Sequence, residues 1–172
     1  MSDQGSKRVK QSPSLKARAL RLLSLREYSR KGLRAKLAES EMRWGKLGGH
    51  QAEQTPESTT AQIEAVLDDF EARGWLSDTR FAESLVRRRS ERYGIRKIAD
   101  ELERAGIDSK QSAKLLGTLK DTEFERAYEL WRKKYGVTAQ DQKERARQYR
   151  YLASKGFGSE IVTKVIGGHR PG

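Results

Sequence analysis

The stretch SLVRRRSERYGIRKIADELERAGI, residues 84–107, holds two helical patterns that meet at a Tyr-Gly pair. Leu85 belongs to a first apolar stripe, and Ile95, Ile98 and Leu102 recur at the spacing of a second helix. Positions 84–98 hold six Arg or Lys and one acid, with no Cys, His or glycine-rich loop. The stretch is typical of helices that present fixed positive charge, and it lacks the clustered groups that catalysis needs.

Parts of this stretch recur further along the chain. Arg92-Tyr93-Gly94 returns as Lys134-Tyr135-Gly136, and Glu-Arg-Ala-Gly-Ile at 103–107 resembles Ala-Ser-Lys-Gly-Phe at 153–157. Each of these motifs is expected to close a helix. With the apolar stripes around them, the repeats predict three units of three helices, at residues 14–74, 77–120 and 121–168. Units this small bury little surface alone, so we expect an all-α, elongated and curved array of tandem repeats.

Capping residues predict where several of the nine expected helices begin and end. Ser29 is expected to cap the second helix, Gly74 to end the third, and Thr122 with Glu125 to form a capping box. No stretch alternates convincingly with a period of two, so no sheet is expected. The first 13 residues are expected to form a disordered basic arm.

The first unit is interrupted by a polar segment between its second and third helices. Residues 40–60 are rich in Gly, Gln, Ser and Thr, and they hold Trp44 and His50. Two helices of a compact unit need only about 2–8 connecting residues. We therefore expect a flexible, passive insertion at about 40–60.

The composition narrows the class of protein. Hydrophobic and charged residues each make up 35% of the chain, which favours small helical units over one thick core. The absence of Cys fits a reducing compartment. No apolar run approaches the roughly 20 residues of a membrane helix, and the first 14 residues lack the apolar region of a signal peptide. We expect a cytoplasmic monomer without membrane contact.

Charge occurs in blocks along the chain. The net charge of +12 is the sum of +9 over 1–50, −6 over 51–83, +5 over 84–98, −3 over 99–129 and +7 over 130–172. This banding predicts a basic face assembled from several helices, with ordinary solvated helix faces as the alternative. Such a face suits a polyanion or an acidic protein surface. The residues expected to form it are Arg87, Arg88, Arg89, Arg92, Arg96, Lys97, Arg132, Lys133, Lys134, Arg145, Arg147 and Arg150. Three of them, Arg88, Arg92 and Lys97, avoid the Phe81–Leu85 stripe and are expected to be mostly exposed.

Other candidate residues favour structural roles. Core packing is favoured over base stacking for four aromatic residues, Tyr93, Trp131, Tyr135 and Tyr149, which mostly lie on apolar stripes. Asp68 and Asp69 point about 100° apart on a helix, so an acid–base pair is not expected. His50 and His169 are isolated and make no metal site. No catalytic, cofactor-binding or metal-binding residue is therefore expected.

Four segments in sequence resemble the RecX family, regulators of the bacterial RecA recombinase. They are ALRLLSLREYSRKGLRAKL (19–37), VLDDFEARGWLSDTRFAESLVRRR (66–89), YGIRKIADELERAGI (93–107) and RYLASKGF (150–157). The resemblance implies a non-enzymatic modulator that binds the RecA–single-stranded DNA filament, lodges in its groove and limits its activity. It leaves open whether the filament is capped or invaded, and how much direct DNA contact, duplex included, contributes. A stand-alone helix-turn-helix-like DNA-binding regulator is the alternative.

Overall fold

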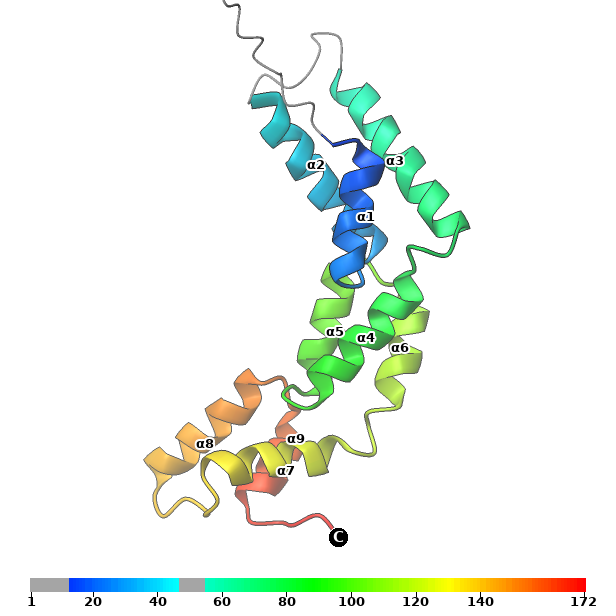
Figure 1. The fold of residues 1–172 in the computed structure, drawn as a ribbon. Coiled ribbons are helices and arrows are strands. Elements are labelled where there is room, and N and C mark those ends of the chain that lie inside the picture. Colours follow the sequence, from blue (N-terminus) through cyan, green and yellow to red (C-terminus); the bar gives the residue numbers. More distant parts are fainter. Residues whose placement is uncertain (1–12, 47–54) are drawn as a thin grey trace, which may run out of the picture. The chain divides into compact units, whose positions relative to one another are not determined.

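The computed structural model describes residues 13–46 and 55–172 of the chain. These residues hold nine helices and no strand, so the predicted all-α fold is confirmed for this part of the chain (Figure 1). The helices are α1 (Leu15–Leu25), α2 (Arg30–Lys46), α3 (Pro56–Ala72), α4 (Asp78–Ser90), α5 (Ile95–Arg104), α6 (Ser109–Gly117), α7 (Glu123–Lys134), α8 (Gln142–Ser154) and α9 (Ser159–Ile166). They form two compact bodies, residues 1–77 and 78–172. The predicted basic arm lies outside the described residues except for Pro13, and the curved array stays a prediction.

The first body is a bundle of α1, α2 and α3. Its core includes Leu33 and Leu37 from α2 and Leu67 and Phe70 from α3, each no more than 1% exposed. Ala19 brings α1 against them. These are the residues that recur every three or four positions in the sequence, so the apolar stripes of the three helices meet as expected.

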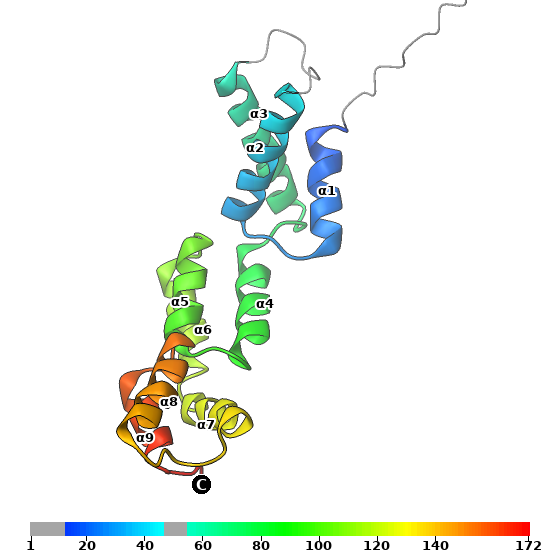
Figure 2. The ribbon, with the colours of Figure 1, turned by 90° about the vertical axis from the view of Figure 1, so that its left-hand side faces the viewer.

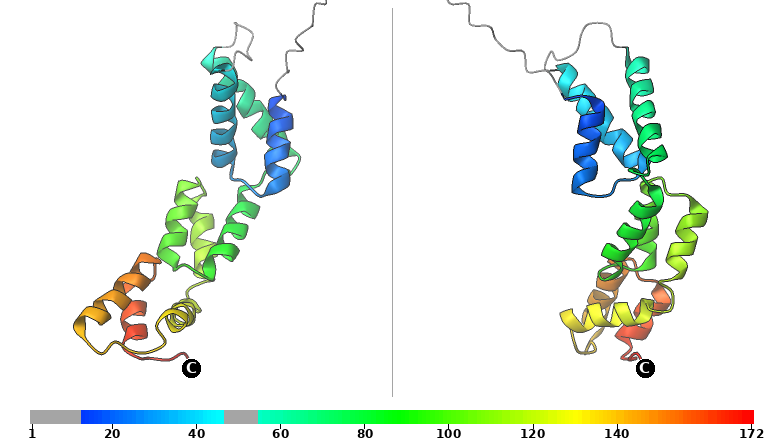
Figure 3. Two further views of the ribbon diagram at one scale, coloured as in Figure 1. Left: turned by 60° about the vertical axis from the view of Figure 1, so that its left-hand side comes forward. Right: turned by 45° about the vertical axis from the view of Figure 1, so that its right-hand side comes forward.

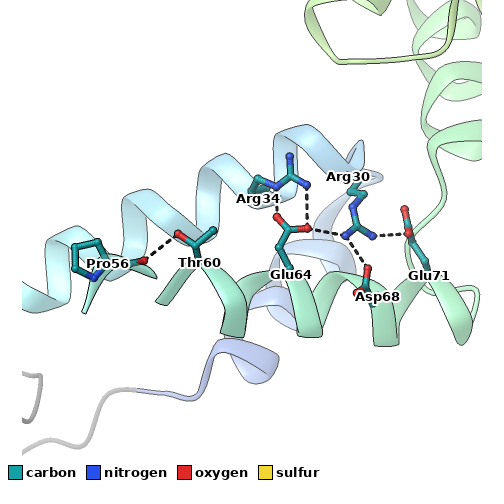
Figure 4. A network of polar contacts seen from close by, with 7 residues as sticks. All are labelled: Arg30, Arg34, Pro56, Thr60, Glu64, Asp68 and Glu71. Atoms are coloured by element: carbon teal, nitrogen blue, oxygen red, sulfur yellow. Dashed lines mark hydrogen bonds and ion pairs between the residues drawn. The ribbon is translucent and has the colours of Figure 1, made fainter. Parts of the chain in front are cut away.

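A network of ion pairs joins α2 to α3 (Figure 4). The Arg30 guanidinium donates to Glu64 at 2.7 Å, to Asp68 at 2.7 Å and to Glu71 at 2.5 Å. Arg34 also donates to Glu64. The hydrogen bonds from Arg34 and Arg30 hold the pKa of Glu64 below its ordinary value. The cations of this α2 face are therefore largely neutralised within the body.

The capping predictions are partly confirmed. The Ser29 hydroxyl accepts a hydrogen bond from the Gly32 amide at 3.0 Å, as a cap of α2 should. Gly74 has a φ of 70° directly after α3, which is the left-handed stop that glycine allows. The capping box at α7 is wrong, because the Thr122 side chain makes no capping bond and its hydroxyl donates to the Leu119 carbonyl instead.

The predicted insertion at 40–60 is too long. Helix α2 continues to Lys46 and α3 begins at Pro56, so Trp44 lies on a helix. Ala, Glu, Met and Arg favour helix even without an apolar stripe. At the other end, Thr55 caps α3 by accepting from the Ser58 amide, and Pro56 occupies the first turn. Residues 47–55 separate the two helices, and of these 47–54, with His50, lie outside the described residues.

The second body has two hydrophobic cores. Ile98 and Leu102 lie at the centre of the core of α4, α5 and α6. Leu152 and Phe157 lie in that of α7, α8 and α9. The second core also contains a polar pair, in which the indole N–H of buried Trp131 donates to Gln148 at 2.8 Å. The pair satisfies groups that would be costly to bury alone.

The α4–α6 and α7–α9 halves of this body are joined through their backbones at Gly94 and Gly156. Figure 3 shows the two groups of helices from two further sides. The Gly94 amide donates to the Lys155 carbonyl at 2.9 Å, and the Arg96 amide donates to the Gly156 carbonyl at 3.2 Å. A Cβ atom at Gly94 would lie 2.3 Å from the Gly156 oxygen. The end of α8 can therefore approach the start of α5 only because Gly94 has no side chain.

Two side chains of α7 complete this junction. Glu123 Oε1 accepts from the Ile95 amide at 3.0 Å and thereby caps α5 from a distance. Arg126 donates to the carbonyls of Ser90 at 2.8 Å and Tyr93 at 2.9 Å, and of Leu119 at 3.2 Å. These bonds satisfy carbonyls at the end of α4, and α7 is fixed against the α4–α5 corner.

Candidate polyanion-binding face

The predicted basic residues come from the end of α4, the start of α5, the end of α7 and from α8. Ten of the twelve are exposed, and Arg89 and Lys97 are half-buried. Figure 2 shows the α4–α9 body turned so that α5 and α8 are both visible. The junction at Gly94 and Gly156 brings the start of α5 to the end of α8, so basic residues distant in sequence become neighbours.

Cations alternate with tyrosine rings across this junction. Tyr93 has Lys97 4.8 Å, Arg89 5.2 Å and Lys155 5.4 Å from its ring centre. Lys155 is also 5.6 Å from the ring of Tyr151. Lys134 lies 3.9 Å from the Tyr151 ring and 5.6 Å from that of Tyr135. We name this set the cation–tyrosine row; it consists of Arg89, Tyr93, Lys97, Lys134, Tyr135, Tyr151 and Lys155.

The tyrosine rings of the row hold its lysine and arginine cations over their faces. Tyr135 and Tyr151 meet edge to face, with 5.7 Å between their centres. Burial, together with the nearby Tyr135, raises the pKa of Tyr151 above its ordinary value. The phenol therefore stays neutral at physiological pH, and the ring can hold a cation over its face for about 0.5–1 kcal/mol.

Two of the predicted cations are already engaged by carboxylates. Arg89 donates to Glu101 at 2.8 Å, and Arg132 donates to Glu129 at 2.9 Å. The hydrogen bond from Arg132 lowers the pKa of Glu129, and Glu129 raises the pKa of Arg132. Both carboxylates would compete with a ligand, so these two arginines are weaker candidates for direct contact.

The remaining arginines have no such competitor. Within residues 13–46 and 55–172, no ion pair involves the exposed cations Arg87, Arg88, Arg92, Arg96, Lys133, Arg145, Arg147 and Arg150. A guanidinium can bind a phosphate or a carboxylate with two parallel hydrogen bonds. The second body thus presents several exposed arginines that no described ion pair engages.

Comparisons with known proteins bear on this arrangement. Residues 77–116 match the family model described as "RecX, second three-helix domain", and residues 121–166 match "RecX, third three-helix domain". The protein named "Regulatory protein RecX" from Leptothrix cholodnii is 44% identical over 89% of this chain and 87% of its own length. The Ralstonia pickettii protein of that name is 40% identical over 92% and 90%. The chain belongs to the RecX family.

Solved structures agree with the fold of the family. RecX from Lactobacillus salivarius has a TM-score of 0.63 at 21% identity and covers 89% of this chain and 92% of its own. A second structure, "regulatory protein RecX", has a TM-score of 0.65 at 23% identity and covers 89% of this chain and 70% of its own. The RecX resemblance stated from the sequence is therefore confirmed.

The RecX sequence pattern did not predict the environment of every candidate. Lys97 is only half-exposed, because it lies close against Gly156. A Cβ atom added at Gly156 would be 2.5 Å from Lys97 Cβ and 2.6 Å from the Lys97 backbone nitrogen. The expectation that Lys97 is mostly exposed is wrong. Tyr151 and Lys155 were not among the predicted site residues, although Lys155 precedes the repeated Gly156. Their position in the row depends on helices far apart in the sequence.

The aromatic and acidic candidates have structural partners. Trp131 is 4% exposed, and Tyr149 packs against the core of α7–α9, as predicted. Asp68 pairs with Arg30, and Asp69 pairs with Lys16 and Arg73, so the two do not act as one carboxylate pair.

Residues 13–46 and 55–172 include neither a cluster of metal ligands nor a helix that could cross a membrane. His169 Nδ1 lies 3.1 Å from the Lys164 carbonyl oxygen. In the part of the chain with described structure, no group of three His, Cys, Asp or Glu could hold a metal ion. None of the described helices is long and apolar enough to cross a membrane.

Proposed function

We propose that this RecX-family chain binds the RecA–single-stranded DNA filament and limits recombinase activity by occupying it. The observation that carries the proposal is the cation–tyrosine row, together with the exposed arginines of the second body that no described ion pair engages. Strand phosphates require exposed positive charge, and the tyrosine rings, partly buried against the two cores, hold cations over their faces. The family resemblance supplies RecA as the partner, and the face would meet the strand, the acidic residues of a protein groove, or both.

The action proposed is occupancy without a reaction. Glu101 and Glu129 are each paired with an arginine of the predicted face, so these carboxylates already serve in ion pairs. Occupancy of a filament would lower its activity in proportion to binding. The proposed setting is the control of DNA repair, recombination and the SOS response in the cytoplasm.

The direct test is ATP turnover by RecA on single-stranded DNA, titrated with the protein. Inhibition that saturates with protein concentration and weakens with salt is expected. A protein that leaves RecA turnover unchanged at saturating concentration, under conditions where it binds the DNA alone, would refute the proposal.

A second measurement separates this function from that of a stand-alone regulator. A sequence-reading protein contacts base edges and loses affinity when its duplex site is scrambled. The proposed modulator should bind strands of scrambled sequence equally well and should bind most tightly when RecA is present. Strong preference for one duplex sequence would favour the regulator instead.

A further inference from the structure

A basic groove lies on the first body, between α1 and α2, away from the α2–α3 ion-pair network. Its lining includes five cations and one carboxylate: Arg18, Arg21, Arg26, Lys36, Arg43 and Glu39. Leu22 and Tyr28 add apolar surface to it. None of these five cations belongs to the face of the second body. The groove is therefore a separate concentration of positive charge.

The one carboxylate of the groove neutralises little of this charge. Glu39 accepts from Lys36 at 3.0 Å and from Arg43 at 2.8 Å, so it is shared between two cations. Arg21 and Arg26 are exposed and have no ion-pair partner among residues 13–46 and 55–172. On the α2–α3 face, by contrast, one Arg30 contacts three carboxylates. Arg18 also pairs with Glu41, so the surplus charge of the groove is carried by Arg21 and Arg26.

Arg18, on α1, binds two side chains of α2 at the groove. Its guanidinium pairs with Glu41, which is 8% exposed, and donates to the Ser40 hydroxyl at 2.6 Å. Its Nε is buried and makes no hydrogen bond within the described structure. A buried donor without an acceptor is costly, because it loses its water without replacement.

The groove repeats a feature of the second body. Tyr28, Tyr93 and Tyr135 each follow the first helix of a three-helix group. Each has a cation over its ring: Arg26 at 4.6 Å, Lys97 at 4.8 Å and Lys134 at 5.6 Å. The tyrosine with its cation therefore occurs at the same corner three times, and the first copy opens onto the groove.

We infer that the α1–α2 groove is a second, independent binding site for the phosphates of a single-stranded nucleic acid. Four of its five cations are arginines, whose planar forks match phosphate oxygens, and Leu22 offers apolar surface for sugars. The charge of the groove alone predicts binding of a polyanion. The choice of a nucleic acid over an acidic polypeptide rests on the proposed function. Two sites on one chain would raise overall affinity beyond that of either.

The test measures binding of a labelled oligothymidine to the full-length protein without RecA, over a series of salt concentrations. We expect R21E/R26E to lose about tenfold in affinity, which is about 1.4 kcal/mol. The slope of log affinity against log salt should fall by about 1.4, since each lost phosphate contact removes about 0.7 for a single strand. R21Q/R26Q should lose less affinity and show the same change of slope.

The matched control is K31E/K46E, which makes the same change of charge at exposed positions of α2 outside the groove lining. It should leave the slope unchanged, and thermal unfolding should be alike for both double variants. Equal binding losses in the two variants, or an unchanged slope in R21E/R26E, would overturn the inference. So would polyglutamate that displaces the oligothymidine at equal charge concentration, because the groove would then prefer an acidic polypeptide.

The failure of this inference is distinguishable from failure of the proposed function. Wild-type inhibition of RecA together with unimpaired DNA binding by R21E/R26E overturns the groove alone. Groove-dependent DNA binding by a protein that leaves RecA turnover unchanged overturns the proposed function and supports the groove.

Discussion

The α2–α3 face of the first body and the α4–α8 face of the second are both rich in arginine, but they use it differently. Arg30 and Arg34 are matched by Glu64, Asp68 and Glu71, so that these charges hold two helices together. Arg88 and Arg92 have no acidic partner in the described chain. The difference teaches that the placement of acids, and not the number of arginines, decides whether a basic helix is structural or is available to a partner.

The same two regions also differ in how their helices are joined. Side chains connect α2 to α3, whereas backbone groups connect α5 to the end of α8 at Gly94 and Gly156. Surface ion pairs tolerate substitution because each contributes little. A backbone contact without room for a methyl group does not tolerate substitution of its glycines. The stability of the second body should therefore be the more sensitive to small substitutions at its helix junction.

The largest effect is expected from Gly94→Ala. The added Cβ would lie 2.3 Å from the Gly156 oxygen, and both partners are backbone that cannot turn aside. We expect a loss of about 3 kcal/mol, as for severe overpacking, measured by thermal or urea unfolding. Gly117→Ala is the control, because a Cβ there meets nothing within 4 Å. It should leave stability unchanged or raise it by up to about 1 kcal/mol. Equal stability of the two variants would show that the junction can relax.

Arg126→Ala should have the next largest effect. Burial lowers the pKa of Arg126, and the nearby Glu123 opposes this shift. The burial of the charged guanidinium therefore costs free energy, which its hydrogen bonds to the Ser90 and Tyr93 carbonyls offset. Without the guanidinium those carbonyls lose their donors, and we expect about 2 kcal/mol of destabilisation in unfolding measurements. Arg104→Ala, at an exposed position of α5, should change stability by no more than about 0.5 kcal/mol. Comparable losses in both variants would contradict a special role for Arg126.

The basic face is tested by R88E/R92E/R96E. Lys97 is left out of this set because it is half-buried against Tyr93 and Gly156. Folding should be nearly unchanged, within about 0.5 kcal/mol for each exposed position. Inhibition of RecA turnover should fall at least tenfold, about 1.4 kcal/mol, and the deficit should shrink as salt rises.

The control for the basic face is K110E/K114E/K120E, which reverses three exposed lysines in the acidic block. It should weaken inhibition much less. If the two triple variants inhibit alike, then net charge and not this face governs binding. If the arginine variant unfolds, the residues are structural.

The smallest effect is expected from Arg30→Gln in the first body. The pairs of Arg30 are partly exposed, so we expect a loss below about 1 kcal/mol at neutral pH. Because the folded-state pKa of Glu64 is lowered, its pairing stabilises the fold above its ordinary pKa of 4.5 and is lost as pH falls through the folded pKa. The difference from wild type should therefore shrink below pH 4.5 in urea unfolding. Lys31→Gln, exposed on the same helix, should show no such pH dependence.

The sequence predicted those parts of the fold that depend on neighbours along the chain. Apolar spacing predicted the helices, and Ser29 and Gly74 marked boundaries because capping is local. The end of α2 was missed because it has no apolar stripe, although Thr55-Pro56 was a readable start for α3. The Gly94–Gly156 contact could not be predicted, because nothing local pairs two glycines so far apart.

The candidate site was predictable to a similar extent. Exposure of Arg88 and Arg92 followed from their avoidance of the apolar stripe. The bond between Arg89 and Glu101 and the burial of Lys97 depend on how α4, α5 and α8 pack, which no periodicity specifies. The two cations of Tyr151 come from α7 and from the end of α8, so its role also required the structure.

The start of α5 has a consequence for the order of biosynthesis. The Ile95 amide is bonded by Glu123, and the Arg96 amide is bonded by Gly156, far later in the chain. A ribosome must therefore deliver α7 and all of α8 from its exit tunnel before the first turn of α5 is complete. Helices α4–α6, although fully synthesised by Gly117, remain unfinished until nearly the whole protein has emerged. A nascent chain stopped after α6 would expose this open turn to proteases.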